Sequence, residues 1–476
     1  MATTLLRSAR RIYTCDDRDT VLDDAWIVVE NEKIAAIGDG PPPSIQADKT
    51  IDLAGSIVTP GLINIHHHFF QSITKALPFV QKSFVLDWLL KLYPLWVEIG
   101  PEEMAAATKV AAAELLLSGG TTSVDHSYMV PGADFEILET QVQTCHDMGL
   151  RLHLVVGSMP TLEGNLEELL RPIIGDKIGR LIDPVDRAYD IMRRTARRFH
   201  DTSANAAVQV ALGPVGVTYA LPDMMRKVAR IADEYGCGLH THLHPRPDER
   251  EKASRFLQSD PVAYLGASNW MRPGTWFAHC SQLTDDEMRA FADNGVGVAH
   301  CAHTLPRLGF PLTRISQMRK FGVAIGIGVD GCASNDSGSI LHDLRLALIL
   351  HRAGTPAGTD TQAAWLSPYD ALLMATRDGA RIIGRSDIGQ LAPGFAADIA
   401  AFKLDRVGYA GSYGDPLSAL LLAGCDPYAQ MTMMGGSVVV WNGEFTQHDE
   451  SVIMTEASAA TERIIRRANM IPLLTD

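Results

Sequence analysis

The stretch Leu62-Ile63-Asn64-Ile65-His66-His67-His68 decides how this chain folds. An apolar run that ends abruptly in polar side chains is typical of a buried strand whose last residues reach a functional face. Side chains at positions i and i+2 of a strand share one face, so His66 and His68 converge while His67 points away. Two such imidazoles are a suitable beginning for a divalent metal site, although an isolated pair is equally compatible with hydrogen-bonded core histidines.

Apolar segments of this kind recur along the chain and alternate with amphipathic stretches. Helix start signals lie between them, such as Pro101 before two glutamates and the capping-box pattern Thr284-Asp285-Asp286-Glu287. This alternation favours a parallel sheet covered on its outer face, and eight units predict an α/β fold of the (β/α)8 TIM-barrel type. The expected strands are Leu62–His68, Thr121–His126, Arg151–Gly157, Ala207–Leu212, Gly238–His244, Thr275–His279, Gly295–His300 and Val323–Asp330.

Short strand patterns with turn residues flank the barrel on both sides. Trp26–Glu30 and Lys33–Ile37 precede it, while Ala397–Phe402 and Ser437–Trp441 follow it. We therefore predict a small composite β-sandwich domain from residues 1–59 plus 390–448, with the barrel of residues 60–389 inserted in it. Residues 449–476 are predicted to form a C-terminal helix.

Composition narrows the class of function. The 476 residues include 42 Lys plus Arg against 56 Asp plus Glu, and this acidic balance argues against nucleic acid or an anionic membrane as partner. No apolar run reaches the 18 residues that a membrane span needs. Seven cysteines without CxxC pairs indicate reduced thiols, and hence a cytoplasmic protein. We expect a small-molecule substrate.

Further metal-ligand side chains end other expected strands. The fifth ends in His240-Thr241-His242-Leu243-His244, the sixth in Ala278-His279 and the eighth in Gly328-Val329-Asp330. The carboxyl ends of barrel strands meet at one face, where barrel active sites lie. Three neutral imidazoles and one carboxylate hold a divalent metal that lowers the pKa of bound water, and Asp330 can accept the proton of that water.

These residues resemble the amidohydrolase superfamily along nearly the whole chain. The likeness is greatest to its cytosine-deaminase-like branch, which includes s-triazine hydrolases, hydroxyatrazine aminohydrolases, and 8-oxoguanine or isoxanthopterin deaminases. The segments that carry it are Pro60-Gly61-Leu62-Ile63-Asn64, His67-His68-Phe69-Phe70-Gln71, Asp125-His126, Gly328-Val329-Asp330-Gly331, Ala333-Ser334-Asn335-Asp336, and residues 389–398, which match the pattern Gly-x-Leu-x-x-Gly-x-x-Ala-Asp.

The resemblance implies a set of roles. The metal ligands would be His66, His68, His242 and Asp330, and the catalytic residues would be His279, beside the bound water, and Asp330. The fourth expected strand contains no lysine to bridge two metals, so one ion is expected, with zinc as the first choice and iron as the alternative. The residues expected to contact the substrate are Gln71, Trp88, His126 and His303. The resemblance also suggests a homo-oligomer.

Two positions depart from the pattern of the branch. Deaminases of this group carry a glutamate three residues after the strand-five ligand, and Pro245 stands there instead. Glu249 or Glu251 could supply the carboxylate, and His244 or His303 could take over proton transfer. The second departure is the apolar Leu305, which replaces a ring-binding asparagine and gives the site a more apolar wall.

The main hypothesis is therefore a mononuclear metal-dependent hydrolase. Hydroxide formed on the metal would attack an sp2 carbon of a small, heteroaromatic nitrogen compound and expel an amine, ammonia or halide. Because Pro245 replaces the glutamate, a hydrolase of amide, carbamate or urea C–N bonds is the alternative enzyme. A non-catalytic binding protein that retains the metal, or a metal-dependent decarboxylase, is the alternative from another class.

Overall fold

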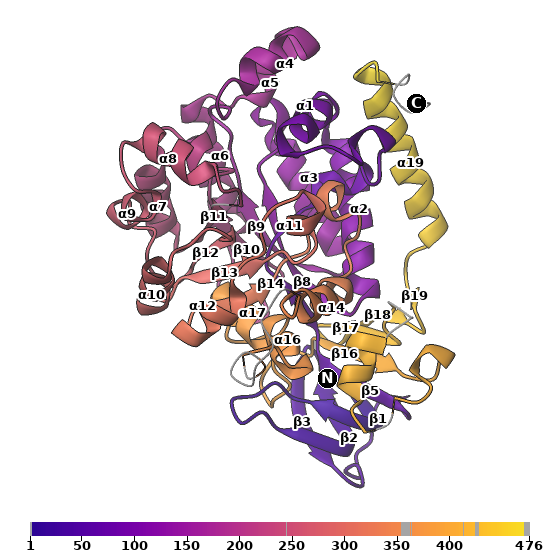
Figure 1. Ribbon diagram of the computed structural model, residues 1–476. Helices are drawn as coiled ribbons and strands as arrows, with labels where there is room; N and C mark the ends of the chain where they lie inside the picture. Colours follow the sequence, from indigo (N-terminus) through magenta and orange to yellow (C-terminus); the bar gives the residue numbers. More distant parts are fainter. Residues whose placement is uncertain are drawn as a thin grey trace.

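The centre of the molecule is a parallel eight-stranded sheet surrounded by helices (Figure 1). The computed structural model describes residues 2–243, 245–353, 362, 364–412, 414–423 and 428–470. The strands follow the order β14-β13-β12-β11-β10-β9-β8-β6, which confirms the predicted α/β barrel. Their bounds are β6 Leu62–Asn64, β8 Gly120–Ser127, β9 Arg151–Val156, β10 Val208–Leu212, β11 Gly238–Leu243, β12 Thr275–His279, β13 Gly297–His300 and β14 Ala324–Ile327.

The first and last strands close the barrel through a short additional pair. Strand β7 (His67–His68) pairs in parallel with β15 (Asp330–Gly331). The Ile65 amide donates to the Ile327 carbonyl at 2.9 Å, and the Asp330 amide donates to the His66 carbonyl at 3.0 Å. Closure therefore brings the histidine-rich end of the first strand beside Asp330.

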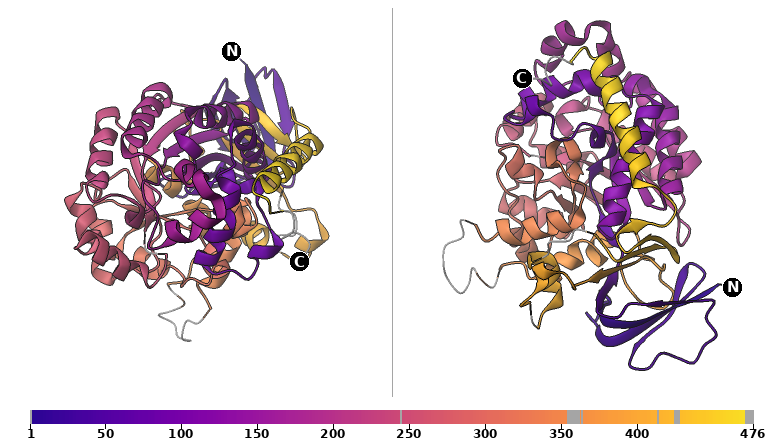
Figure 2. Two further views of the ribbon diagram at one scale, coloured as in Figure 1. Left: turned by 90° about the horizontal axis from the view of Figure 1, so that it is seen from above. Right: turned by 90° about the vertical axis from the view of Figure 1, so that its right-hand side faces the viewer.

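Helices cover the outer face of the sheet, as the view along the barrel shows (Figure 2). The predicted capping box is present, because the Thr284 hydroxyl accepts from the Glu287 amide and the Glu287 carboxylate accepts from the Thr284 amide. The helices are α1 Val85–Trp96, α2 Pro101–Leu117, α3 Phe135–Met148, α4 Leu166–Ile174, α5 Ile178–Leu181, α6 Val185–Phe199, α7 Met224–Tyr235, α8 Glu249–Leu257, α9 Pro261–Ala267, α10 Asp285–Asp293, α11 Thr304–Arg307, α12 Ile315–Phe321, α13 Cys332–Asn335, α14 Ile340–Leu350, α16 Pro368–Met374, α17 Arg377–Ile382 and α18 Pro416–Ser418.

A second sheet combines strands from both ends of the chain. Its path is β19-β18-β17-β16-β5-β1-β2-β3, with β4 paired to β1, and the antiparallel β16–β5 pair joins the two halves. This confirms a β domain built from both ends, while the boundaries at residues 59, 390 and 448 stay a proposal. The strands are β1 Thr3–Tyr13, β2 Val21–Glu30, β3 Lys33–Asp39, β4 Lys49–Asp52, β5 Ser56–Pro60, β16 Ile399–Lys403, β17 Met431–Met434, β18 Ser437–Trp441 and β19 Glu444–Phe445.

The last described helix, α19 (Glu450–Arg467), runs along the outside of the barrel beside α2 (Figure 2). Lys109 of α2 pairs with Glu456 of α19 at 2.6 Å. In the part of the chain that the structure describes, no helix has the length and apolar character of a membrane span.

Candidate metal centre and active-site cavity

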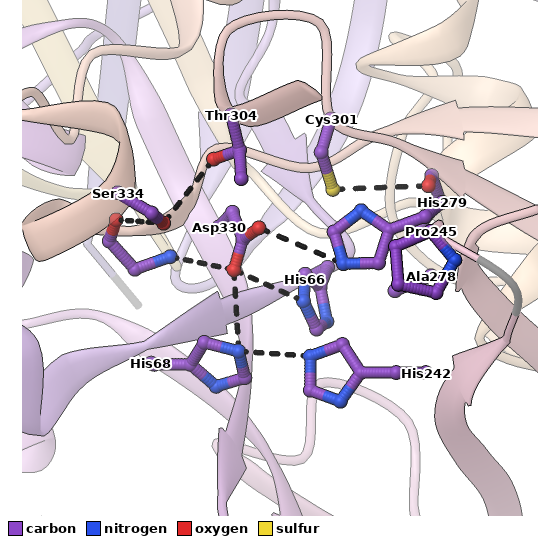
Figure 3. Close-up of polar contacts among 12 residues, drawn as sticks. His66, His68, His242, Pro245, Ala278, His279, Cys301, Thr304, Asp330 and Ser334 are labelled. Atoms are coloured by element: carbon purple, nitrogen blue, oxygen red, sulfur yellow. Dashed lines mark hydrogen bonds and ion pairs between the residues drawn. The ribbon is translucent and has the colours of Figure 1, made fainter. Parts of the chain in front are cut away.

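Four side chains from three parts of the barrel converge at the carboxyl ends of its strands (Figure 3). The Nε2 atoms of His66 and His68 lie 3.3 and 3.2 Å from Asp330 Oδ1. The Nε2 atoms of His68 and His242 lie 3.1 Å apart. The structure thus brings together the four predicted ligands.

The hydrogen positions on these rings favour a cation between them. The Nδ1 of His68 faces the His126 carbonyl at 2.9 Å, and the Nδ1 of His242 faces the Val215 carbonyl. A carbonyl oxygen only accepts, so both Nδ1 atoms carry the hydrogen and both Nε2 atoms present lone pairs. Two lone pairs 3.1 Å apart repel each other unless a positive ion lies between them. Ligand nitrogens on a tetrahedral zinc ion are about 3.4 Å apart, so the residues fit such an ion.

Burial keeps His66 and His242 in the neutral form that binds metals. It lowers the pKa of His66 to about 3 and that of His242 well below its ordinary value. The backbone is also strained here, because Asp330 has φ +62° and His279 has φ +74°, in the left-handed region that side chains other than glycine rarely adopt. Such strain is concentrated at functional sites.

His279 stands beside the four ligands as predicted. Its Nε2 lies 3.7 Å from Asp330 Oδ2, and its carbonyl accepts from the Thr313 hydroxyl at 2.6 Å. Cys301 lies close enough to His279 and Asp330 to be grouped with them. However, burial raises the pKa of the Cys301 thiol well above its ordinary value, which argues against a thiolate ligand or nucleophile.

A cavity of about 110 Å³ opens above the ligands, and aromatic side chains form part of its wall. Gln71 and Trp88, two of the predicted substrate contacts, line it. The Trp88 indole donates to the Ala333 carbonyl at 3.2 Å, and Gln71 Oε1 accepts from the Ala333 amide at 3.3 Å. The other aromatic lining residues are Tyr93, Tyr128, Tyr219 and Phe310.

The other two predicted substrate contacts, His126 and His303, are not among the described residues that line this cavity. His126 lies below the ligands, where its carbonyl anchors His68 and its Nε2 faces the Gly213 carbonyl at 3.2 Å. The His303 amide donates to Asp343. Substrate contact by these two histidines therefore stays a prediction, and the structure gives His126 an anchoring position instead.

The residues considered as substitutes for the missing glutamate lie in different places. Pro245 lines the cavity, and so does Glu249, which is 5% exposed at the start of α8. Glu251 lies on the surface, where it pairs with Arg255. His244 lies outside the described residues.

The sequence reasoning missed part of the cavity wall. Tyr128 follows the end of β8 by one residue, so the strand-end rule could have identified it. Glu163 and Arg246, which form an ion pair at the cavity, lie on connecting segments without a motif. No pattern of spacing would have indicated that they meet.

Comparison with known proteins agrees with this geometry. Residues 57–439 match the model of the "Amidohydrolase family". The chain is 36% identical over 98% of its length to the whole of an 8-oxoguanine deaminase from Pseudomonas aeruginosa. It is 32% identical to a hydroxydechloroatrazine ethylaminohydrolase from Pseudomonas sp. strain ADP, covering 98% of this chain and 96% of the relative. Atrazine chlorohydrolase from Arthrobacter aurescens TC1 complexed with zinc superimposes with a TM-score of 0.87 at 31% identity, covering 96% and 100% of the two chains.

Proposed function

Because this chain belongs to the amidohydrolase family, we propose that it is a zinc-dependent aminohydrolase of a small oxo-substituted nitrogen heterocycle. The observation that carries the proposal is the pair of Nε2 lone pairs of His68 and His242, which face each other at 3.1 Å beside Asp330. His66, His68, His242 and Asp330 would hold the ion. When bound, zinc supplies a Lewis acid and lowers the pKa of a water molecule.

The residues beside the ligands are suited to move protons. His279 Nε2 and Asp330 Oδ2 are 3.7 Å apart, so a proton taken up at the carboxylate can pass to the imidazole with a small movement. Departure of an amine requires a proton at its nitrogen. His279 and Asp330 both line the cavity, so a proton that they hold can be passed on toward the substrate.

A third group for proton transfer is the carboxylate of Glu249. Three carboxylates line the cavity among the described residues: Glu163, Glu249 and Asp330. Glu163 pairs with Arg246 and with Lys252, the latter at 3.5 Å, and Asp330 belongs to the metal cluster. Glu249 begins helix α8 shortly after Pro245, and its buried side chain lines the cavity. On this position we assign protonation of the leaving group or of a ring nitrogen to Glu249, in place of the glutamate that Pro245 replaces.

The cavity wall supports a planar substrate. Trp88 and three tyrosines offer flat apolar surfaces, and Gln71 offers an amide nitrogen as hydrogen-bond donor to a ring oxygen or nitrogen. The names of the relatives with 36% and 32% identity, an 8-oxoguanine deaminase and a hydroxydechloroatrazine ethylaminohydrolase, support oxo-purines and hydroxytriazines as first candidates.

The test combines metal analysis with an assay for released ammonia or ethylamine. We expect about one zinc per chain, and turnover of 8-oxoguanine, isoxanthopterin or an N-ethyl hydroxytriazine. His66→Ala and Asp330→Asn should abolish both zinc binding and turnover. Adding zinc back to the metal-stripped wild type should restore its turnover. Full activity in the metal-stripped protein would refute the proposal. Zinc binding without any product would favour a binding protein, and turnover of carbamates alone would favour the amide-type alternative.

Location and assembly are further proposals. Six described cysteines are buried and unpaired, which supports a reducing, cytoplasmic compartment. Helix α19 leaves Val452 and Met454 exposed at 49% and 63%, which supports contact with a second copy of the chain. Light scattering would test this assembly, because a monomeric mass at micromolar concentration contradicts it.

A further inference from the structure

His66 differs from the two other ligand imidazoles in the group that holds its outer nitrogen. The Nδ1 atoms of His68 and His242 face backbone carbonyls. The Nδ1 of His66 instead lies 2.8 Å from Nε2 of His240, and Nδ1 of His240 lies 2.9 Å from the Trp276 carbonyl. The outer partner of His66 is therefore a side chain, and substitution can remove it.

The direction of this short chain of hydrogen bonds follows from its last acceptor. The Trp276 carbonyl only accepts, so His240 carries a hydrogen on Nδ1 and, when neutral, a lone pair on Nε2. His66 must then donate from Nδ1, which leaves its own Nε2 lone pair directed at Asp330 and the ligand cluster. If His240 carried a second hydrogen on Nε2, His66 would turn a hydrogen toward the cluster and could not bind a metal.

The same residues could be mistaken for a second metal site. His66, His126 and His240 lie close enough together to be candidates for one. However, the 2.8 Å contact between His66 and His240 has the length of a hydrogen bond. It is shorter than the separation of about 3.4 Å between two nitrogens on a tetrahedral ion. The distance therefore favours a hydrogen bond.

The ring of His240 is fixed by its surroundings. It stacks on the Trp276 indole, with 4.8 Å between ring centroids and 21° between planes. The same indole donates from Nε1 to the Ile65 carbonyl at 3.0 Å, next to His66 in the chain. Trp276 thus supports the ring of His240 directly and the backbone next to His66, and all of these residues are fully buried.

We propose that His240 is a positioning residue that selects the tautomer and the ring orientation of His66 required for metal binding. Partners of this kind raise the basicity of a ligand and fix its direction, and their loss typically costs 10–100-fold in metal affinity. The inference rests on the proposed function, because it requires that His66 binds a metal. Its test nevertheless measures metal affinity and not only turnover.

The experiment compares His240→Phe with His153→Phe. His153 is a suitable control because it is buried and packs in a T-shaped arrangement with the same Trp276, with 5.5 Å between ring centroids, but has no described contact with a ligand. The dissociation constant of zinc is measured by competition with a chromophoric chelator. We expect His240→Phe to bind zinc about 10–100-fold more weakly than the wild type, and His153→Phe to bind it within about threefold.

A second pair of variants covers the case in which His240→Phe does not fold. In His240→Gln the amide can still accept from His66 Nδ1, whereas the shorter side chain of His240→Asn does not reach it. We expect zinc to bind His240→Gln more tightly than His240→Asn. The visible spectrum of the cobalt-substituted protein should resemble that of the wild type only in the Gln variant.

Several outcomes would overturn the inference. They are wild-type zinc affinity in His240→Phe, equal weakening in His153→Phe, or equal affinities and spectra in the Gln and Asn variants. Two zinc ions in the wild type, with one lost in His240→Phe, would show a second metal site instead. A wild-type chain that binds no zinc would refute the proposed function itself, so the two failures are distinguishable.

Discussion

Breaking the buried ion pair between Arg151 and Asp398 should destabilise the protein more than removing both partners together. Arg151 begins β9 of the barrel, and Asp398 immediately precedes β16 of the second sheet. The guanidinium donates from Nε to Oδ2 at 2.6 Å and from Nη2 to Oδ1 at 3.0 Å. The two side chains are only 3% and 2% exposed, so the pair joins the two sheets away from water.

The size of the effect follows from burial. Arg151→Met leaves the Asp398 carboxylate buried without its cation, which typically costs about 3–5 kcal/mol. The double variant Arg151→Met/Asp398→Leu removes both charges. It still removes the partners of the Gly435 amide and the Asn205 carbonyl, at 2.8 and 2.6 Å. These two groups are only partly buried, so water can replace the lost partners at less than the cost of about 1–3 kcal/mol that each group would carry if fully buried. The double variant should therefore be more stable than Arg151→Met.

Thermal unfolding of the wild type, the single variants and the double variant provides the assay. Unfolding entropies of about 2.1 cal/mol/K per residue imply about 1 kcal/mol/K for this chain, so Arg151→Met should lower the midpoint by about 3–5 °C. As a control, Arg171→Met removes an exposed pair with Glu167 and should shift it by less than about 1 °C. If the midpoint of the double variant fell by the sum of the two decreases seen in the single variants, the reasoning would be refuted, because the two charges would then act independently.

Further substitutions test the cavity and one buried carboxyl. Glu249→Gln should lower the turnover of amine-releasing substrates by about 10²–10⁴-fold and that of a chloride-releasing analogue much less, and equal losses would contradict the assigned proton transfer. In Gly331→Ala the new Cβ would clash with Gln71 Oε1 and displace that side chain, so KM should rise with zinc content unchanged, whereas an unchanged KM would contradict substrate contact by Gln71. Burial raises the pKa of Asp183 to about 6, and the hydrogen bond that its carboxylate accepts from the Met159 amide offsets only part of this rise. Since the folded state binds this proton more tightly, the associated stability is present below about pH 4 and is lost as pH rises through about 6. Asp183→Asn should therefore stabilise the protein at pH 7 by about 1–3 kcal/mol and leave it unchanged at pH 4, and chemical denaturation at the two pH values checks this.

The barrel and the meeting of metal-binding side chains at one of its ends were predictable because both depend on local patterns, whereas the choice of His242 among the histidines of the fifth strand came from the family resemblance. Each strand is an apolar run, and in a parallel barrel the carboxyl ends of all strands meet at one face. His66, His68 and Asp330 come directly after such runs, so their convergence followed from where the strands end. The strand bounds differ from the prediction mainly where backbone geometry interrupts pairing, as between β6 and β7.

The role of His240 was not predictable, because strand periodicity places it on the same face as His242. Both side chains point into the barrel, and residues two apart differ only in depth along its axis. Depth is set by register against the neighbouring strand: His242 lies opposite Ala278, while His240 lies opposite Trp276. A small residue leaves room for a ligand cluster, whereas the large indole supports the ring of His240 from one side. Which residues lie opposite each other is decided only when the strands pair in the folded sheet, so the sequence alone does not give this register.

The cavity wall required tertiary structure for a related reason. The glutamate position of the family lies on the segment after β11, and Pro245 removes its carboxylate without removing the need for a proton. The Ser281 hydroxyl donates to the Pro245 carbonyl at 3.1 Å, which fixes this segment beside the end of β12. Helix α8 then begins at Glu249, whose buried side chain reaches the same cavity. Under the proposed assignment, a carboxylate from the start of α8 would serve the same face of the barrel as the glutamate that Pro245 replaces.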